Sequence, residues 1–168
     1  MAKHFGPLRS VMIGRMGTAV LQVAQFAPAI LSVNLGQLQA LAQNADGSLV
    51  AAASFLPGLP AHPATAGDTI TVWMTGLGPV TTGTTGQTAP DSSQQATTQP
   101  VVFIGGIPAQ VTSAGLSTQY VGVNQVTAFV PTGTPTGSSV PVQVQVNGIT
   151  GPDPVVLAIQ PPPQMVSN

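Results

Sequence analysis

The chain has no cysteine, no glutamate and little charge of either sign. Of its 168 residues, three are Lys or Arg and four are Asp, so charged residues make up 4 %, against about a quarter in an ordinary soluble domain. Without cysteine, the chain has no thiolate zinc site, disulfide or cysteine nucleophile. Its three cations, Lys3, Arg9 and Arg15, all precede residue 16. The remaining chain has no positive charge to neutralise phosphates, which excludes a nucleic-acid binder.

Long hydrophobic runs are also missing. The hydrophobic fraction is 43 % and the mean hydropathy is +0.35, which is enough for a core at this length. However, no stretch of about 18 apolar residues is free of polar interruption. The nearest candidate, residues 16–33, contains Gln22, Gln25 and Pro28. The sequence therefore predicts no membrane-spanning helix.

Glycine and proline are abundant, with 19 and 17 copies, and they separate short alternating apolar runs. In Thr69–Thr75, apolar residues at 70, 72 and 74 alternate with Thr and with Trp73, which is typical of a half-buried antiparallel strand. Val140–Val146 alternates in the same way, and Asn147-Gly148 after it is a strong hairpin signal. Further strands are predicted at residues 38–42, 49–52, 101–104, 107–111, 124–130 and 155–159.

Two other segments are predicted to lie outside the central strands. Residues 55–67 contain three prolines, which donate no ladder hydrogen bond. Residues 80–99 have no apolar period and are expected to form a long exposed loop. Seven to nine short strands at this spacing predict an all-β, immunoglobulin-like antiparallel β-sandwich over residues 18–160, with a tail at 161–168. A closed barrel is the structural alternative.

The N-terminal region has two interpretations. A basic stretch, an apolar stretch and Ala40-Leu41-Ala42 follow the order of a secretory signal and its cleavage site, which predicts a mature start near Gln43. Alternatively, Thr18–Gln25 is a strand, and residues 1–17 are a disordered basic leader or a remnant of a longer chain. Residues 18–26 are then either part of this sandwich or the last strand of a truncated preceding domain.

Residue types that carry catalysis are scarce. The four aspartates stand beside turn formers, so we interpret them as turn residues; they are Asp46, Asp68, Asp91 and Asp153. His62, between Ala61 and Pro63, is expected to be an exposed loop histidine. A triad of Ser54, His62 and Asp68 has no nucleophile-elbow motif around it. We therefore expect no catalytic residue.

Metal and cofactor sites are not expected either. Asn44, Asp46 and Ser48 alternate like the start of a calcium loop, but the acidic ligand at its end is missing. A hairpin turn is the better interpretation of this segment, because Asp46-Gly47 is a turn signal.

The two residues most suited to binding are Trp73, the only tryptophan, and Tyr120, the only tyrosine. Aromatic side chains are favoured at interfaces and stack on sugars. The structural alternative places Trp73 under the segment between Pro57 and Pro63, and gives Tyr120 a hydrogen bond to nearby backbone at a sandwich corner.

Several strings resemble a bacterial family of uncharacterised C-terminal domains first noted in Solibacter proteins, which is related to the IPT/TIG immunoglobulin-like modules. They occur in the family's order at residues 27–31, 44–49, 66–68, 72–79, 104–109, 114–116, 121–126, 130–131 and 137–148. The most specific are Thr75-Gly-Leu-Gly-Pro79 and Gly122-Val-Asn-Gln-Val126. After Ala114-Gly-Leu116, Ser117-Thr-Gln119 stands where the family has Pro-Gly.

The resemblance implies a secreted or cell-surface β-sandwich, usually at the end of a larger protein, with no enzymatic activity and no catalytic residues to transfer. We accordingly expect a non-catalytic structural or interaction module with an adhesion, spacer or assembly role. Its expected partners are neighbouring domains, other proteins or further copies of itself, since a net charge near zero promotes association. The alternative is a carbohydrate-binding module of an extracellular hydrolase, with Trp73 and Tyr120 as its sugar platform.

Overall fold

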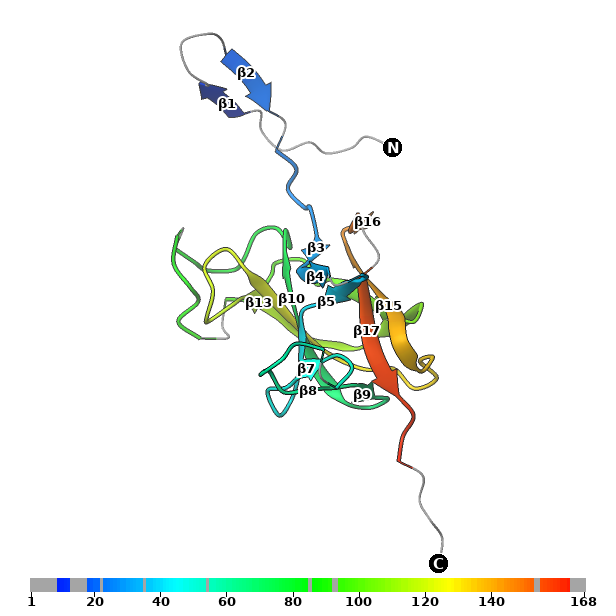
Figure 1. The fold of residues 1–168 in the computed structure, drawn as a ribbon. Helices are drawn as coiled ribbons and strands as arrows, with labels where there is room; N and C mark the ends of the chain where they lie inside the picture. The colour runs from blue at the N-terminus through cyan, green and yellow to red at the C-terminus, as the bar shows by residue number, and fades with distance from the viewer. Residues whose placement is uncertain are drawn as a thin grey trace, which may run out of the picture.

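The computed structural model describes residues 9–12, 18–21, 23–34, 36–53, 55–84, 86–91, 94–152 and 155–163 (Figure 1). Within these ranges the chain is all-β, with strands, turns and loops and no helix. Two sheets share one hydrophobic core, which is the arrangement of a β-sandwich. The predicted fold is confirmed at this level.

The first sheet is built around β10 (Thr69–Thr75), the strand with the clearest alternation in the sequence. Its order is β13-β14-β10-β6-β7-β8, with β3 also paired to β10. The other strands of this sheet are β3 (Ala29–Ile30), β6 (Ala42–Asn44), β7 (Leu49–Val50), β8 (Ala61–His62), β13 (Val111–Leu116) and β14 (Asn124–Phe129).

The second sheet is built around β15 (Gly137–Val146) and β17 (Val155–Gln160). Its order is β12-β11-β15-β17-β5-β4, with β16 paired to β15 and β9 paired to β17. Its remaining strands are β4 (Ser32–Asn34), β5 (Leu38–Ala40), β9 (Ala64–Thr65), β11 (Val101–Ile104), β12 (Ile107–Ala109) and β16 (Ile149–Thr150).

The sheets differ from the prediction in two respects. They are mixed rather than purely antiparallel, because β7–β8, β17–β5 and β17–β9 are parallel pairs. They also contain more segments than the seven to nine strands expected. The chain passes from the first sheet to the second between β3 and β4, and back between β5 and β6, so one run of residues contributes short strands to both. Such switches form the corners of sandwiches.

The N-terminal residues that the structure describes form β1 (Arg9–Met12) and β2 (Thr18–Leu21), which pair antiparallel as a separate two-stranded sheet. The sequence places residues 9–12 within a basic leader or a remnant of a longer chain, and in the structure they form β1. Further along, Ala40 and Ala42 of the predicted cleavage site are buried in the sandwich core. Residues 29–34 and 36–42 are therefore part of the folded sandwich.

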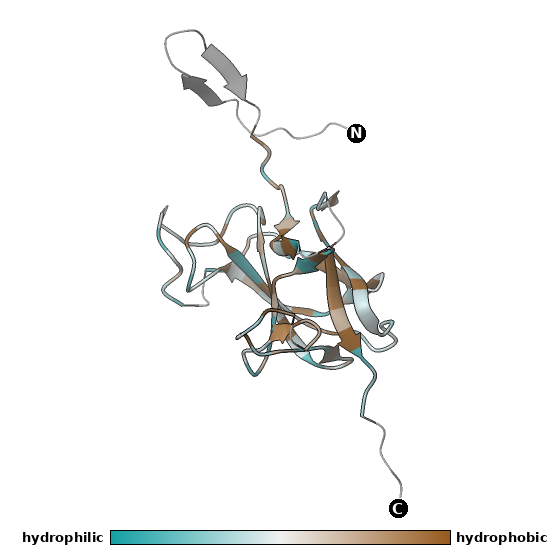
Figure 2. Cartoon of the chain, viewed as in Figure 1, coloured by the Kyte–Doolittle hydropathy of each residue, from teal (hydrophilic) through white to brown (hydrophobic). Residues whose placement is uncertain are grey.

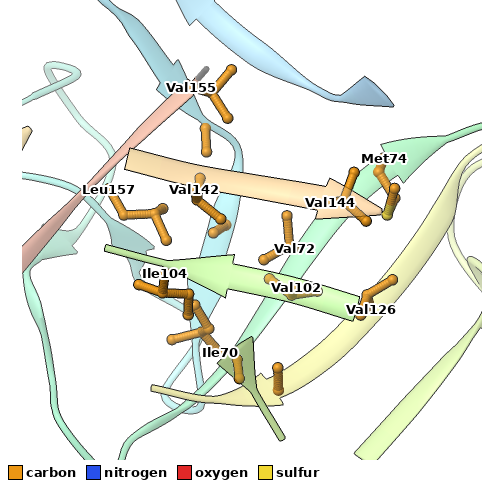
Figure 3. Close-up of a cluster of buried hydrophobic side chains, with 14 of the residues drawn as sticks. Ile70, Val72, Met74, Val102, Ile104, Val126, Val142, Val144, Val155 and Leu157 are labelled. Atoms are coloured by element: carbon orange, nitrogen blue, oxygen red, sulfur yellow. The ribbon is translucent and has the colours of Figure 1, made fainter. Parts of the chain in front are cut away.

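The core lies between the sheets, where strand alternation places the apolar residues (Figure 3). Ile70, Val72 and Met74 of β10 face inward and are almost fully buried. From the opposite sheet, β15 contributes Val142 and Val144. Colouring by hydropathy shows much of β17 in brown, whereas the long loop after β10 is mainly teal to white (Figure 2).

The Thr75-Gly-Leu-Gly-Pro79 string has a physical role in this core. Leu77 is fully buried, and its N–H donates to Oδ1 of the buried Asn124 at 3.4 Å. Gly76 has φ of 75°, and a Cβ there would lie 1.9 Å from the carbonyl oxygen of Ala27. Gly78 has φ of 89°, and its Cβ would meet the Phe26 ring at 2.5 Å. A side chain at either position would clash with Phe26 or Ala27, in the segment before β3, so both positions require glycine.

The segment 80–99 is only partly the exposed loop that its composition predicts. Most of its described residues are exposed, but Ala89 is buried. Ala96 N–H donates to Ala114 O at 2.7 Å, and Leu116 N–H donates to Gln94 O at 3.1 Å. These bonds cover the outer edge of β13, a strand that the sequence did not predict. An uncovered sheet edge can pair with another chain and promote aggregation, so this segment protects the sheet. No helix of the described residues has the length and hydropathy needed to cross a membrane.

Candidate functional site

An open apolar groove lies on the outer side of the first sheet and contains both aromatic residues singled out in the sequence. Its volume is about 520 Å³, within the range of ligand-binding clefts. We call it the Trp73 groove; it is lined by Leu31, Leu41, Trp73, Gln119, Tyr120, Val121 and Val123. None of these residues carries a charge.

The floor of the groove is held by a closed set of three backbone hydrogen bonds. Leu41 N–H donates to Leu31 O at 2.8 Å, Leu31 N–H donates to Trp73 O at 2.9 Å, and Trp73 N–H donates to Leu41 O at 3.1 Å. Leu31 and Leu41 are the two residues at which the chain changes sheets. The sheet corner therefore positions two leucines beside the tryptophan.

Trp73 reaches the groove because β10 alternates. Val72 and Met74 point into the core, so the side chain between them lies on the opposite face. There its ring contacts Tyr120, with ring centroids 6.4 Å apart and ring planes at 87°. This is the edge-to-face arrangement that aromatic pairs favour. The segment between Pro57 and Pro63 contributes no residue to the groove.

The wall of the groove is the loop between β13 and β14, and the buried Ser117 organises it. Ser117 Oγ accepts from the N–H groups of Gln119 at 3.1 Å and Tyr120 at 3.2 Å. Its N–H donates to Val123 O at 2.8 Å, which closes the base of the loop. Tyr120 and Val121 at the tip are 55 % and 57 % exposed. A hydrogen-bonded loop thus presents two exposed apolar side chains, an arrangement associated with binding.

The sequence identified the aromatic members of this site and missed the others. Trp73 and Tyr120 lie together as partners in one groove. Leu31, Leu41 and Ser117 were not singled out, and their roles depend on the sheet corner and on the loop hydrogen bonds. The signal for Ser117 was present, since a hydroxyl that accepts local backbone N–H groups is typical of a turn.

The remaining polar candidates form a different feature, an ion pair between the Asn44–Ser48 turn and β8. Nε2 of His62 lies 3.0 Å from Oδ2 of Asp46, and Nδ1 lies 2.9 Å from the carbonyl oxygen of Pro63. Asp46 Oδ1 accepts from both the N–H and the hydroxyl of Ser48. Asp46 is thus a turn residue, as predicted, but His62 lies in a strand and has an ionic partner that the sequence did not reveal.

These contacts shift both pKa values toward the charged forms. The hydrogen bond to the Pro63 carbonyl, followed by the one to Asp46, raises the pKa of His62 above 6.5. The hydrogen bonds from Ser48, followed by the one from His62, lower the pKa of Asp46 from 3.8 to about 2. Asp46 therefore stabilises the fold above pH 3.8, and this is lost as the pH falls toward 2. His62 stabilises the fold below pH 6.5, and this is lost as the pH rises through its raised pKa.

We expect Asp46→Asn to lower the melting temperature more between about pH 4 and pH 6.5, where both Asp46 and His62 are charged, than above the raised pKa of His62, where only Asp46 is. The asparagine keeps an acceptor for Ser48 but removes the negative charge. Because the pair is exposed to solvent, the effect is small, at most a few degrees, and it weakens in high salt. Thermal melts of the wild type, the single variants and the double variant with His62→Gln measure it. If the effect of Asp46→Asn still changes between pH 6.5 and the raised pKa of His62 in the His62→Gln background, the ion-pair assignment is contradicted.

The other two polar arrangements considered from the sequence are not assembled among the described residues. Asp68 Oδ2 accepts from Thr65 N–H at 2.7 Å, while His62 pairs with Asp46; Ser54 and Asp153 lie outside the described residues. Asn44 Nδ2 donates to Ser48 Oγ at 3.1 Å and to His62 O at 3.1 Å, within a hydrogen-bonded turn. No group of three or more His, Cys, Asp or Glu side chains in the described part of the chain could hold a metal ion.

The fold and the groove together define a class: a β-sandwich with an uncharged aromatic groove on one outer face. Comparison of the chain with models of known families, with curated proteins and with solved structures gives no match. The function is therefore argued from the groove itself.

Proposed function

We propose that this chain is a non-catalytic, immunoglobulin-like interaction module of a secreted or cell-surface bacterial protein, and that the Trp73 groove binds an apolar segment of a protein partner. The observation that carries the proposal is the pairing of the half-buried Trp73 with the exposed Tyr120 in an uncharged groove. The assignment to the IPT/TIG-related family rests on the quoted strings. Two of them, Ala27–Leu31 and Val72–Pro79, pack against each other, since Ala27 N–H donates to Gly76 O at 3.0 Å.

The chemistry of the groove favours an uncharged, apolar ligand. Leu31, Leu41, Val121 and Val123 supply aliphatic surface, and a charged ligand group would lose its hydration there without finding an opposite charge. The side-chain hydrogen-bond donors of the lining residues are the Gln119 amide, the Trp73 indole and the Tyr120 hydroxyl. An apolar side chain of a partner can pack on the aliphatic surface. If that side chain stands on an extended backbone, the partner's carbonyl groups can accept from these donors.

A sugar ligand is supported less well by the same geometry. Stacking on a flat sugar requires exposed aromatic rings that are roughly coplanar, whereas the planes of Trp73 and Tyr120 meet at 87°. The perpendicular pair therefore offers no flat platform of two rings. A glycan remains a useful competitor in the experiment that tests the proposal.

The fluorescence of Trp73 provides a direct test, because no other tryptophan is present. Short uncharged peptides that differ only in one central Leu, Phe, Pro or Asp are titrated into the protein. We expect saturable changes in emission with the apolar residues and none with Asp. Val121→Asp is expected to weaken binding about tenfold or more, because it places an unpaired charge in the site.

Val23→Asp is the matched control, since Val23 is a similarly exposed valine outside the groove. It should leave peptide binding unchanged. If no peptide alters Trp73 emission, the proposal fails. If a glycan array gives a ligand whose binding is lost in Tyr120→Ala, the carbohydrate-binding alternative replaces it.

A further inference from the structure

We infer that the Trp73 groove of one copy receives the Pro161-Pro162-Pro163 segment of a second copy, so that the chain associates head to tail. The inference rests on the proposed function and names the partner of the groove. It follows from three observations: the chemistry of the segment, the place where it leaves the fold, and the near absence of charge.

The triproline segment has the chemistry that an aromatic groove binds. Three consecutive prolines favour the polyproline II conformation, in which the carbonyl groups make no internal hydrogen bonds and remain available to donors. Proline-rich segments dock in grooves lined by aromatic residues, where little conformational entropy is lost. Proline rings can pack against the aromatic and aliphatic side chains that line the groove, and the Gln119 amide, the indole and the phenol are side-chain donors for the carbonyl groups.

The segment is exposed and starts far from the groove of its own copy. All three prolines are exposed, directly after β17. Gln160, the last residue of β17, pairs with Thr65 of β9, next to the turn that leads into the start of β10. Trp73 lies toward the other end of β10 and on the other sheet. In Figure 1 the chain continues from the end of β17 away from both sheets, where a second molecule can meet it.

Electrostatics do not oppose this contact. The groove and the triproline segment are both uncharged, and the whole chain has a formal net charge of −1. Net charge near zero allows copies to approach without repulsion. Because the groove and the segment are different surfaces, the contact is heterologous, and it extends into open chains unless the geometry closes a ring.

Sedimentation of the full chain from micromolar to millimolar concentration tests the inference. We expect the weight-average mass to rise beyond that of a dimer. Replacing all three prolines by alanine is expected to leave a monomer, and so is Tyr120→Ala. The tail substitutions are at exposed positions after the last strand, so an unchanged melting temperature shows that the fold is intact.

A mixing experiment gives a sharper test. The Tyr120→Ala protein retains the triproline segment, and the triple alanine variant retains the groove. Each alone should be monomeric, while their mixture should form a one-to-one dimer that cannot extend. If the Tyr120→Ala protein also carries Trp73→Phe, the fluorescence of the mixture reports only on the occupied groove.

The outcomes separate this inference from the proposed function. If the wild type stays monomeric at millimolar concentration, or if the triple alanine variant associates as the wild type does, the head-to-tail contact is wrong. Should apolar peptides still bind the groove in that case, the proposed function stands without it. If neither the peptides nor the triproline segment alters Trp73 emission, both fail.

Discussion

Gly76→Ala is expected to destabilise the protein by about 3–5 kcal/mol, a large share of the stability of a typical domain. Two costs combine in this estimate. A residue with a Cβ at φ of 75° loses about 1–2 kcal/mol through backbone strain. In addition, the new Cβ would lie 1.9 Å from the carbonyl oxygen of Ala27 and 2.4 Å from its carbonyl carbon. Backbone atoms cannot rotate away, so the segment before β3 must move.

Gly58→Ala separates the two costs. Gly58 has φ of 83°, close to that of Gly76, but a Cβ there meets nothing within 4 Å. Its variant therefore measures the backbone strain alone, about 1–2 kcal/mol. Urea unfolding of both variants gives the two free energies, and the melting temperature of Gly76→Ala should be lower by about 10 °C or more. Equal losses in the two variants would mean that the segment at Ala27 adapts freely, and would remove the physical explanation of the Gly-Leu-Gly string.

Much of the fold follows from local patterns in the sequence. Thr69–Thr75 forms a strand with the predicted inward and outward faces, because period two and one polar face specify the register. The alternating valines of β15 and the Asn147-Gly148 turn after them are confirmed in the same way. These elements carry their own signals, so each can be identified from the sequence without knowing its neighbours.

The strands at the sheet corners could not be predicted so well. Between residues 29 and 44, β3 and β6 belong to the first sheet and β4 and β5 to the second. The chain changes sheets at Leu31 and Leu41, which look like ordinary apolar residues in the sequence. Strand β13 contains Gly115, and a Cβ at this position would lie 2.2 Å from Gln94 O. That glycine is explained only by the covering segment, which is distant in sequence. Contacts of this kind depend on the tertiary structure.

The candidate site shows the same division. An outward-facing tryptophan on a regular strand is visible in the sequence, and so is a lone tyrosine near a glycine turn. Their edge-to-face contact depends on strand register, because Trp73 lies opposite Gln125 on β14. This register brings the loop between β13 and β14, which contains Tyr120, next to the Trp73 ring. The pairing of Asp46 with His62 likewise depends on the parallel pairing of β7 and β8.

Leu157→Ala is expected to destabilise the protein by about 2–5 kcal/mol. Leu157 lies on β17, opposite Val140 of β15, and is fully buried. Its loss removes the transfer free energy of the side chain and leaves a cavity between two sheets that cannot easily close. Leu59→Ala is the matched control: Leu59 is 54 % exposed, so the same chemical change should cost less than about 0.5 kcal/mol.

The same variant also distinguishes stability from binding. Leu157 belongs to the second sheet, whereas the Trp73 groove lies on the outer side of the first sheet, with the buried side chains of β10 between them. Below its melting temperature, Leu157→Ala should therefore bind apolar peptides with the affinity of the wild type, measured through Trp73 emission. A loss of affinity in the folded variant would show that packing in the core controls the groove. Unchanged affinity together with a strongly lowered melting temperature assigns Leu157 to the core and the groove residues to binding.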